Sequence, residues 1–351
     1  MPSSADKSDR ENEPRPKVKT KAVTAITQID YRSGQMPKWV KEAIEEQYNI
    51  ESEDAKSAGS LGFMARVLVL ATMPYKDPKA DVFKRQNGNF SLRIVAGFDG
   101  GIPYGIYPRL LMSWVATEAV RTQSPVIELG DSLSQFLRDV MEVRSRGGGA
   151  RGTATRVTEQ MKRLFGSLIT AQYSGEQNGQ GFRLNNVLIA DQLDLAAGFE
   201  KALIDELDAE IETREDSLWI PQRKELAGAW KSEVHLSKNF FEECITKPVP
   251  VDLRAYKALR GSPLAMDIYT WLTYRMSYQQ RRSRPIPWES LMHQFGSAYS
   301  TESAVRDFKK AFIQALKMVL TVYSKANVEV ADKGLILAPS PSHISKQGDL
   351  F

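Results

Sequence analysis

The stretch from Pro285 to Pro339 constrains the fold of this chain more than any other. In its first part, apolar residues occupy the i, i+3, i+4 and i+7 positions of one helical face, and Gly296 follows directly. This spacing predicts a short helix that ends at the glycine. The apolar residues are Trp288, Leu291, Met292 and Phe295.

A longer basic helix is predicted after this turn, with Ser300 or Thr301 as its cap. Two β-rich runs follow, at 328–330 and 335–337, and the four residues between them predict a β-hairpin. Helix, turn, helix and hairpin in this order are typical of a winged helix-turn-helix, which places its second helix in the major groove of DNA. The predicted core face of that helix is Val305, Phe308, Phe312, Leu316 and Val319.

A helical hairpin with a solvated basic face and no nucleic-acid partner would produce the same local pattern, because helix-turn-helix matches are weakly specific. An earlier part of the chain repeats the order of parts. A helix with Trp114, an extended run at 125–129, a short helix and a basic helix precede strands at 182–189. Since chance matches need not recur with matching flanks, the repetition favours DNA binding for both copies.

Further β-rich runs are expected to pair around the first copy, at 66–71 and 90–96, and a strand at 234–241 is expected to begin the second copy. The sequence therefore predicts an α+β fold with two tandem winged helix-turn-helix domains, mainly helical with small β-hairpin wings. The expected divisions are a disordered basic arm (1–24), a helical lead-in and linker (25–60), the first winged helix (61–197), a linker or helix (198–229), the second winged helix (230–340) and a flexible tail (341–351).

The composition places limits on function. The 351 residues carry a net charge of only +4, so any basic surface must come from local clustering. No apolar run approaches the roughly 18 residues needed to cross a bilayer, and the polar amino terminus does not resemble a signal peptide. We therefore expect a cytoplasmic protein without membrane contact.

Catalytic motifs are missing from the sequence. The glycine-rich run 147–153 lacks the lysine of a phosphate-binding loop, which argues against an ATPase. His235, His293 and His343 are far apart and Cys244 is the single cysteine, a pattern that does not predict a zinc site or the paired histidines of a nickase. We expect no enzyme activity, no catalytic residues, no metal and no cofactor.

The basic helices supply the predicted DNA contacts. Arginine can pair with guanine through two hydrogen bonds, and a good pair of this kind discriminates between bases by about 1–3 kcal/mol. The predicted base contacts are Arg156, Gln160 and Arg163 in the first copy and Tyr299, Ser303, Arg306 and Lys310 in the second. The predicted phosphate contacts are Arg144, Arg146, Arg151, Arg183, Arg281, Arg282 and Lys309.

Residues 235–241 (HLSKNFF) and 248–272 (PVPVDLRAYKALRGSPLAMDIYTWL) resemble the plasmid-encoded RepA-type replication initiators. The resemblance covers residues 60–340 in layout and is strongest over 230–325. It implies an initiator that binds direct repeats (iterons) in double-stranded plasmid origin DNA, opens an AT-rich element, and recruits the host replicative helicase and initiator. It also implies homodimers that repress their own promoter, and hence a part in copy number control.

Two other functions remain open: a tandem winged-helix transcriptional regulator without a replication role, and a protein-interaction scaffold. The last five residues help to distinguish the first of these from an initiator. Gln347-Gly348-Asp349-Leu350-Phe351 resembles the pentapeptide that binds the bacterial β sliding clamp, with Gly348 in place of the usual leucine. A terminal Leu-Phe pair on a flexible tail can fill an apolar pocket, whereas the alternative is a frayed terminus without a partner.

Overall fold

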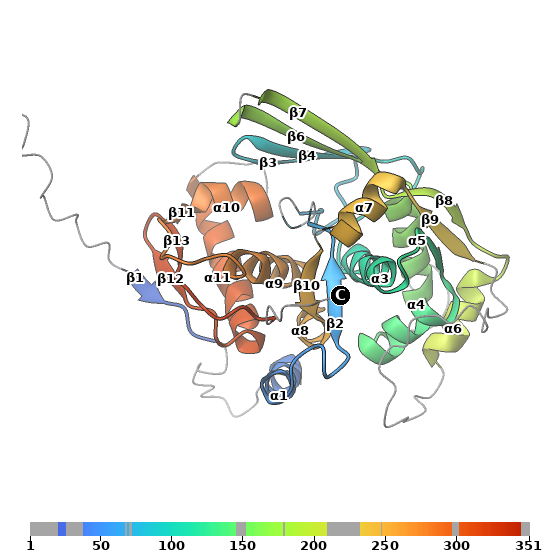
Figure 1. Ribbon diagram of the computed structural model, residues 1–351, viewed down its shortest axis with the longest axis horizontal. Helices are drawn as coiled ribbons and strands as arrows, with labels where there is room; N and C mark the ends of the chain where they lie inside the picture. Colours follow the sequence, from blue (N-terminus) through green and yellow to red (C-terminus); the bar gives the residue numbers. More distant parts are fainter. Residues whose placement is uncertain are drawn as a thin grey trace, which may run out of the picture.

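The computed structural model of the protein contains one continuous hydrophobic core, to which both copies of the repeated pattern contribute. Helices surround a short two-stranded ribbon near the centre, and the other antiparallel sheets lie toward the periphery (Figure 1). The predicted α+β class, mainly helical, is confirmed. The structure describes residues 20–25, 38–66, 69, 72–144, 152–177, 180–208, 232–246, 248–296 and 302–344.

The second copy folds as predicted into a winged helix. Its elements are α9 (Pro263–Met276), β11 (Ile286–Pro287), α10 (Trp288–Phe295), α11 (Glu302–Val322), β12 (Val328–Ala331) and β13 (Gly334–Leu337). Helices α10 and α11 form the helix-turn-helix. The hairpin β12–β13 forms the wing, and β13 pairs on its other edge with β11.

Two glycines allow the elements of this copy to approach one another closely. A Cβ atom added at Gly296, which ends α10, would lie 2.9 Å from the ring of Phe308 on α11. A Cβ atom added at Gly334 would lie 2.0 Å from the backbone oxygen of Ile286. Only glycine leaves room for these approaches, one in the helix-turn-helix and one between the wing and β11.

Aromatic rings hold α10 against α9 and α11. The ring of Phe312 lies 5.5 Å from that of Phe295 and 6.0 Å from that of Trp288, measured between centroids. The ring of Phe295 lies 5.5 Å from that of Trp271. All four side chains are buried. Since each such pair stabilises by about 0.5–1.5 kcal/mol beyond its buried area, the short helix is held firmly.

The first copy has the same order of elements but different strand partners. Its elements are α3 (Tyr107–Thr122), β5 (Val126–Glu128), α4 (Gly130–Gln135), the π-helical turn η2 (Phe136–Val140), α5 (Thr153–Phe165), β6 (Leu168–Gln177) and β7 (Gln180–Leu188). The flanking strands are β3 (Val82–Asn87), β4 (Phe90–Val95), β8 (Ala190–Asp194) and β9 (Glu233–Leu236). The hairpin β6–β7 extends the sheet of β3 and β4, and β5 pairs with β9.

Three expectations about local structure are wrong. Arg66 and Val69 are helical, so the run at 66–71 is not a strand, and β4 pairs with β3 and β6 instead. Strand β9, expected to begin the second copy, pairs with β5 and β8 of the first, and the chain is helical from Lys238 in α7 (Lys238–Thr246). Within the arm expected to be disordered, β1 (Thr20–Ala22) pairs with β12.

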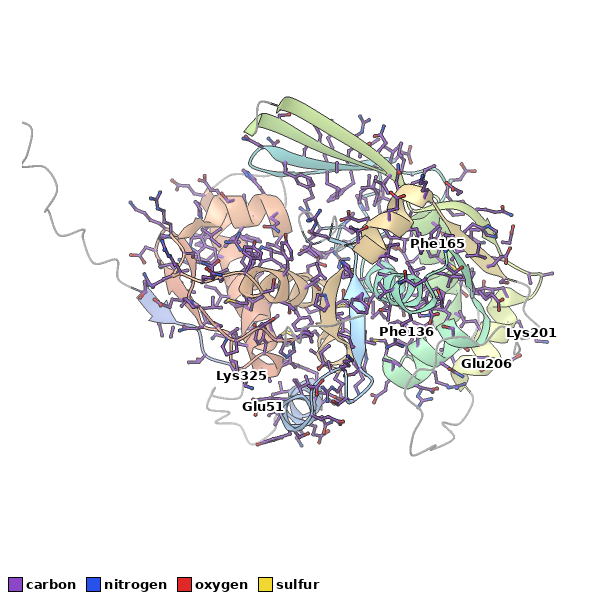
Figure 2. The ribbon with its side chains drawn as sticks, in the orientation of Figure 1. Glu51, Phe136, Phe165, Lys201, Glu206 and Lys325 are labelled. Atoms are coloured by element: carbon purple, nitrogen blue, oxygen red, sulfur yellow. The ribbon has the colours of Figure 1, made fainter. Side chains whose placement is uncertain are left out.

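Several segments join the two copies. Strand β2 (Leu61–Met64) pairs with β10 (Val249–Asp252), which forms the central ribbon of Figure 1. Helix α1 (Lys38–Ser52) packs on α8 (Leu253–Leu259) and reaches the end of α11, where Ser324 donates a hydrogen bond of 2.6 Å to Glu51 near Lys325 (Figure 2). The expected lead-in and both expected domains therefore share one core.

A buried ion pair connects the helices that open the two copies. Nε and Nη2 of Arg109 on α3 donate to the carboxylate of Asp267 on α9 at 2.8 and 2.7 Å, and Arg109 is 1% exposed. The guanidinium also donates to the backbone oxygens of residues 73, 74 and 105. Burial lowers the pKa of Arg109, but Asp267 more than offsets this effect, and the net direction is upward.

A second buried network holds the residues that follow the wing. The Asp252 N–H donates to the hydroxyl oxygen of Tyr269 at 2.9 Å, so this hydroxyl can donate its own proton to Nδ1 of His343, 2.8 Å away. Burial lowers the pKa of His343 to about 4. The imidazole is therefore neutral in the folded protein near pH 7, and residues 341–344 of the tail expected to be flexible are packed against Tyr269 of α9 and Tyr323, which follows α11.

We expect Asp267→Asn to destabilise the protein by about 3–5 kcal/mol, because the charge of Arg109 would stay buried without its counter-charge. Urea unfolding measures this change. The exposed pair Lys238–Glu242, 3.9 Å apart, provides the control, and Glu242→Gln should leave the unfolding midpoint nearly unchanged. Equal effects of the two substitutions would contradict the role given to the buried pair.

Stability should fall as the pH drops from about 6.5 toward 4, because His343 of the unfolded chain takes up a proton that the folded protein does not bind. A pKa of about 4 in place of 6.5 corresponds to about 3 kcal/mol at pH 4, and nothing at pH 8. His343→Gln removes this contribution. The difference in unfolding free energy between wild type and variant should therefore shrink on acidification, and a constant difference would exclude His343 as the cause.

Candidate nucleic-acid interface

Helix α11 presents a polar stripe on the side opposite its core face. Its buried residues begin at Phe312, and none of the residues from Glu302 to Ala311 is buried. The first half of the helix therefore lies at the edge of the core, against which Val305 and Phe308 pack while staying half-buried. The stripe recurs every three or four residues, as positions on one helical face do, and consists of Ser303, Arg306, Lys310 and Gln314, all exposed, followed by the half-buried Lys317.

Three of these side chains, Ser303, Arg306 and Lys310, are among the predicted base contacts, and the structure places them on one face. Gln314 was missed, although the helical period continued from Lys310 leads to it. Arginine, lysine and glutamine are the residue types that read guanine and adenine in the major groove. Asp307 is exposed beside Arg306 and adds an acceptor. Recognition helices contact bases with their N-terminal residues. In α11 this is the half that carries the exposed stripe.

Lys309 lies between α11 and α10. Its Nζ lies 5.0 Å from the ring centroid of Trp288, the first residue of α10. This cation–π contact holds the ammonium near the start of the short helix. Because the first helix of a helix-turn-helix crosses the DNA backbone, the position suits the predicted phosphate contact.

The loop before β11 and the wing add further basic groups. Arg281, Arg282 and Arg284 are exposed. Nη2 of Arg282 lies 2.6 Å from Oε2 of Glu329 on β12, and this hydrogen bond lowers the pKa of Glu329. Lys333 is exposed at the tip of the wing and was also missed, although the hairpin that carries it was predicted. Arg282 is thus tied to the wing, whereas Arg281 in the loop and Lys333 at the wing tip are exposed to solvent.

The corresponding helix of the first copy, α5, is covered by the loop that precedes α3. Gln160 is buried, and its amide oxygen accepts a hydrogen bond of 2.8 Å from the Tyr104 N–H. Arg163 pairs with Glu159 at 3.1 Å, and its guanidinium carbon lies 5.2 Å from the Tyr104 ring. Contrary to expectation, Gln160 and Arg163 are therefore not available to bases in this structure. Arg156 remains exposed, against the ring of Tyr107.

The other predicted contacts are placed only in part. Arg144 is exposed, and its backbone oxygen accepts a hydrogen bond from Thr153 at the start of α5. Arg183 belongs to β7, but its side chain is outside the described part of the chain. Arg146, Arg151, Tyr299 and the pentapeptide at 347–351 also lie outside the described residues.

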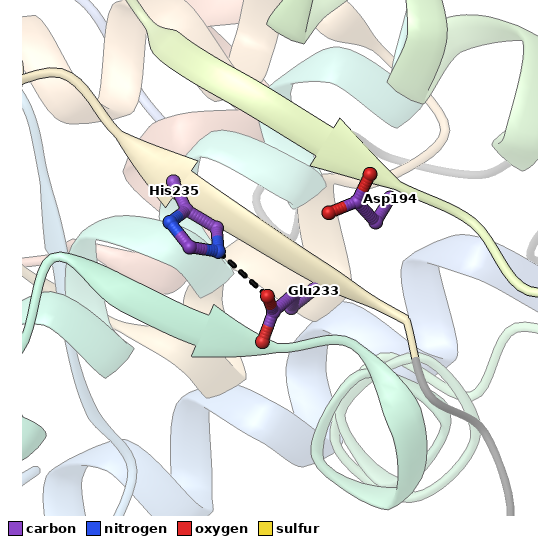
Figure 3. A group of neighbouring side chains, drawn as sticks. All are labelled: Asp194, Glu233 and His235. Carbon is purple, nitrogen blue, oxygen red and sulfur yellow. Dashed lines mark hydrogen bonds and ion pairs between the residues drawn. The ribbon is translucent and has the colours of Figure 1, made fainter.

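Strand pairing brings one histidine beside two carboxylates. Nε2 of His235 lies 2.7 Å from Oε1 of Glu233, and Asp194 on the neighbouring strand lies close to both (Figure 3). Isolation in the sequence therefore did not mean isolation in the fold. Exposed acidic clusters of this kind are common without an ion, and we assign no metal to this one. No helix in the described ranges has the length and apolar character needed to cross a membrane.

Comparison with known proteins identifies a family. The sequence model described as plasmid encoded RepA protein matches residues 102–202 and 198–289. No curated protein sequence matches the chain. The crystal structure of domains 2 and 3 of RctB aligns at 12% identity with a TM-score of 0.43, over 78% of this chain and 95% of that chain, a similarity too low to support a functional argument. The family matches extend over more than half of the length of this chain, which therefore belongs to the family of plasmid-encoded RepA proteins.

Proposed function

We propose that this protein initiates plasmid replication by binding double-stranded origin DNA through its second winged helix. The observation that carries the proposal is the exposed stripe from Ser303 to Gln314 on the polar face of α11. Family membership supports the role in replication. The stripe supports the way in which the DNA is bound.

In the proposed complex, the two kinds of contact come from different elements. Arg306, Lys310 and Gln314 contact base edges in the major groove, while Lys309, Arg281 and Lys333 contact phosphates on either side. The phosphate contacts make the affinity fall as salt rises, whereas the base contacts select the sequence. The proposed binding sites are the direct repeats (iterons) of the plasmid origin, which are several copies of one site.

The first copy has a different proposed role, because α5 is covered along the residues expected to read bases. It contacts DNA through Arg144 and Arg156, outside the covered part of the helix. From family membership we further propose that the protein opens an AT-rich element and recruits the host helicase and initiator. As a dimer, it represses its own promoter. The protein carries out these steps by binding, without catalysis of its own.

Footprinting of the purified protein on DNA that flanks its own gene tests the proposal. Protection of evenly spaced direct repeats, resistant to unrelated competitor DNA, is the expected result. Uniform binding that the competitor removes would indicate a nonspecific basic protein. Absence of binding at low salt would direct attention to protein partners instead.

We expect Arg306→Ala to weaken binding to the repeats by about 1–3 kcal/mol and to relax the preference at one base pair, because a bidentate contact with guanine is lost. Titrations against wild-type and singly changed repeats measure both effects. Lys41→Ala, which replaces an exposed lysine on α1 outside the polar stripe, is the control and should bind normally. If Arg306→Ala keeps full affinity and preference while Arg156→Ala loses them, the first copy reads the bases and the assignment to α11 is wrong.

The tail is proposed to bind the β sliding clamp. Replacing Leu350 and Phe351 by alanine should abolish binding to purified clamp without changing the footprint, because the apolar pair fills the pocket. Gly348→Leu, which restores the usual residue, should strengthen clamp binding. Ser345→Ala, just outside the pentapeptide, is the control. Clamp binding that none of these changes affects would place the contact elsewhere in the chain. Absence of clamp binding by the wild type would exclude the contact.

A further inference from the structure

One arginine of the first copy is buried without a carboxylate partner among the residues that the structure describes. Arg85 on β3 is 6% exposed. Its Nε donates to the backbone oxygen of Thr72 at 3.4 Å, a long hydrogen bond, and the rings of Phe83 and Tyr75 lie 4.9 and 5.7 Å from its guanidinium carbon. Among the residues that the structure describes, no ion pair includes Arg85.

The charges around this arginine do not cancel. The guanidinium groups of Arg109 and Arg85 both lie against the ring of Tyr75, but the carboxylate of Asp267 is engaged through both of its oxygens by Arg109. Burial lowers the pKa of Arg85, the direction expected for a cation that lacks a close counter-charge. Because burial of an unpaired charge is unfavourable, an anion supplied from outside the chain would stabilise this region.

A cavity of about 120 Å³ lies next to Arg85, between β3 of the first copy and α10 of the second. Its lining residues are Lys84, Arg85, Gln86 and His293. Strand β3 is at the edge of its sheet, and the hydrogen bond from Ala96 N–H to the Asp81 oxygen sets the pairing with β4. The alternation of an antiparallel pair therefore leaves the backbone N–H and C=O groups of Lys84 and Gln86 on the free edge.

We propose that this cavity binds a phosphate group, carried either by a DNA backbone or by free phosphate. Its lining residues are an arginine, a lysine, a glutamine and a histidine, none of them acidic, and the free edge of β3 adds backbone N–H groups. Arginine matches the geometry of phosphate oxygens, and sheet edges form concave anion sites. Since the walls come from β3 and α10, the phosphate is held by both copies at once.

Titration calorimetry of the full chain with inorganic phosphate, at constant ionic strength in chloride, tests the site. Lys84→Met and Arg85→Met should each weaken phosphate binding at least about tenfold, which corresponds to about 1.4 kcal/mol. Lys41→Met replaces an exposed lysine on α1 and should bind phosphate as the wild type does. Undetectable phosphate binding to the wild type, or equal binding by all variants, would overturn the proposal.

Thermal unfolding separates this role from a structural one. Without phosphate, Arg85→Met should not lower the melting temperature, because an apolar chain replaces an unpaired buried charge. A lower melting temperature together with unchanged phosphate binding would mean that Arg85 only supports the fold. If Arg85→Met does not fold, Lys84→Met decides, since Lys84 is exposed.

Addition of a saturating DNA duplex distinguishes the two sources of phosphate. If a phosphodiester occupies the cavity, the duplex should abolish binding of inorganic phosphate, and Lys84→Met should weaken duplex binding. If free phosphate is the ligand, both should bind together. The titration with inorganic phosphate contains no DNA, so it can succeed even if α11 reads no bases, and Arg306→Ala should leave it unchanged.

Discussion

The ion pair between Arg109 and Asp267 constrains how the two copies of the repeated pattern pack. It joins α3 to α9, the equivalent helices of the two copies, in a region where Arg109 is almost fully removed from water. A buried pair of this kind adds little stability over an apolar contact, but breaking it is costly. In this packing arrangement Arg109 donates two hydrogen bonds to Asp267 and further hydrogen bonds to three backbone carbonyls. The β2–β10 ribbon beside it supports the same arrangement.

Within this shared core, one sequence pattern has two structural outcomes. In the second copy the wing pairs with β11, and the first half of α11 lies at the edge of the core with its polar face exposed. In the first copy the hairpin β6–β7 is part of a four-stranded sheet, and β5 pairs with β9. The loop before α3 lies along α5. Helices that look equivalent in sequence therefore differ in what they can contact.

Local charge, and not total charge, distinguishes the surfaces proposed to bind DNA and phosphate. The net charge of +4 is small, and several basic groups are already engaged: Arg163 with Glu159, Arg282 with Glu329, and Arg138 of η2 with Glu206 of α6 (Phe199–Asp208; Figure 2). Those that lack a close carboxylate partner among the described residues are the informative ones. On α11 they are exposed and support the proposed DNA recognition, and at Arg85 the charge is buried beside a cavity.

The sequence by itself determined the α+β class, the order of elements in both copies, the end of α10 at Gly296 and the wing hairpin, because helical period, turn residues and caps act between near neighbours in the chain. It also placed Ser303, Arg306 and Lys310 on one helical face. Only the tertiary structure decided that β9 pairs with β5, that Gln160 is buried under a loop, that His235 meets two carboxylates, and that Arg85 meets none within the described part of the chain. These features depend on contacts between residues far apart in the chain, which no local pattern specifies.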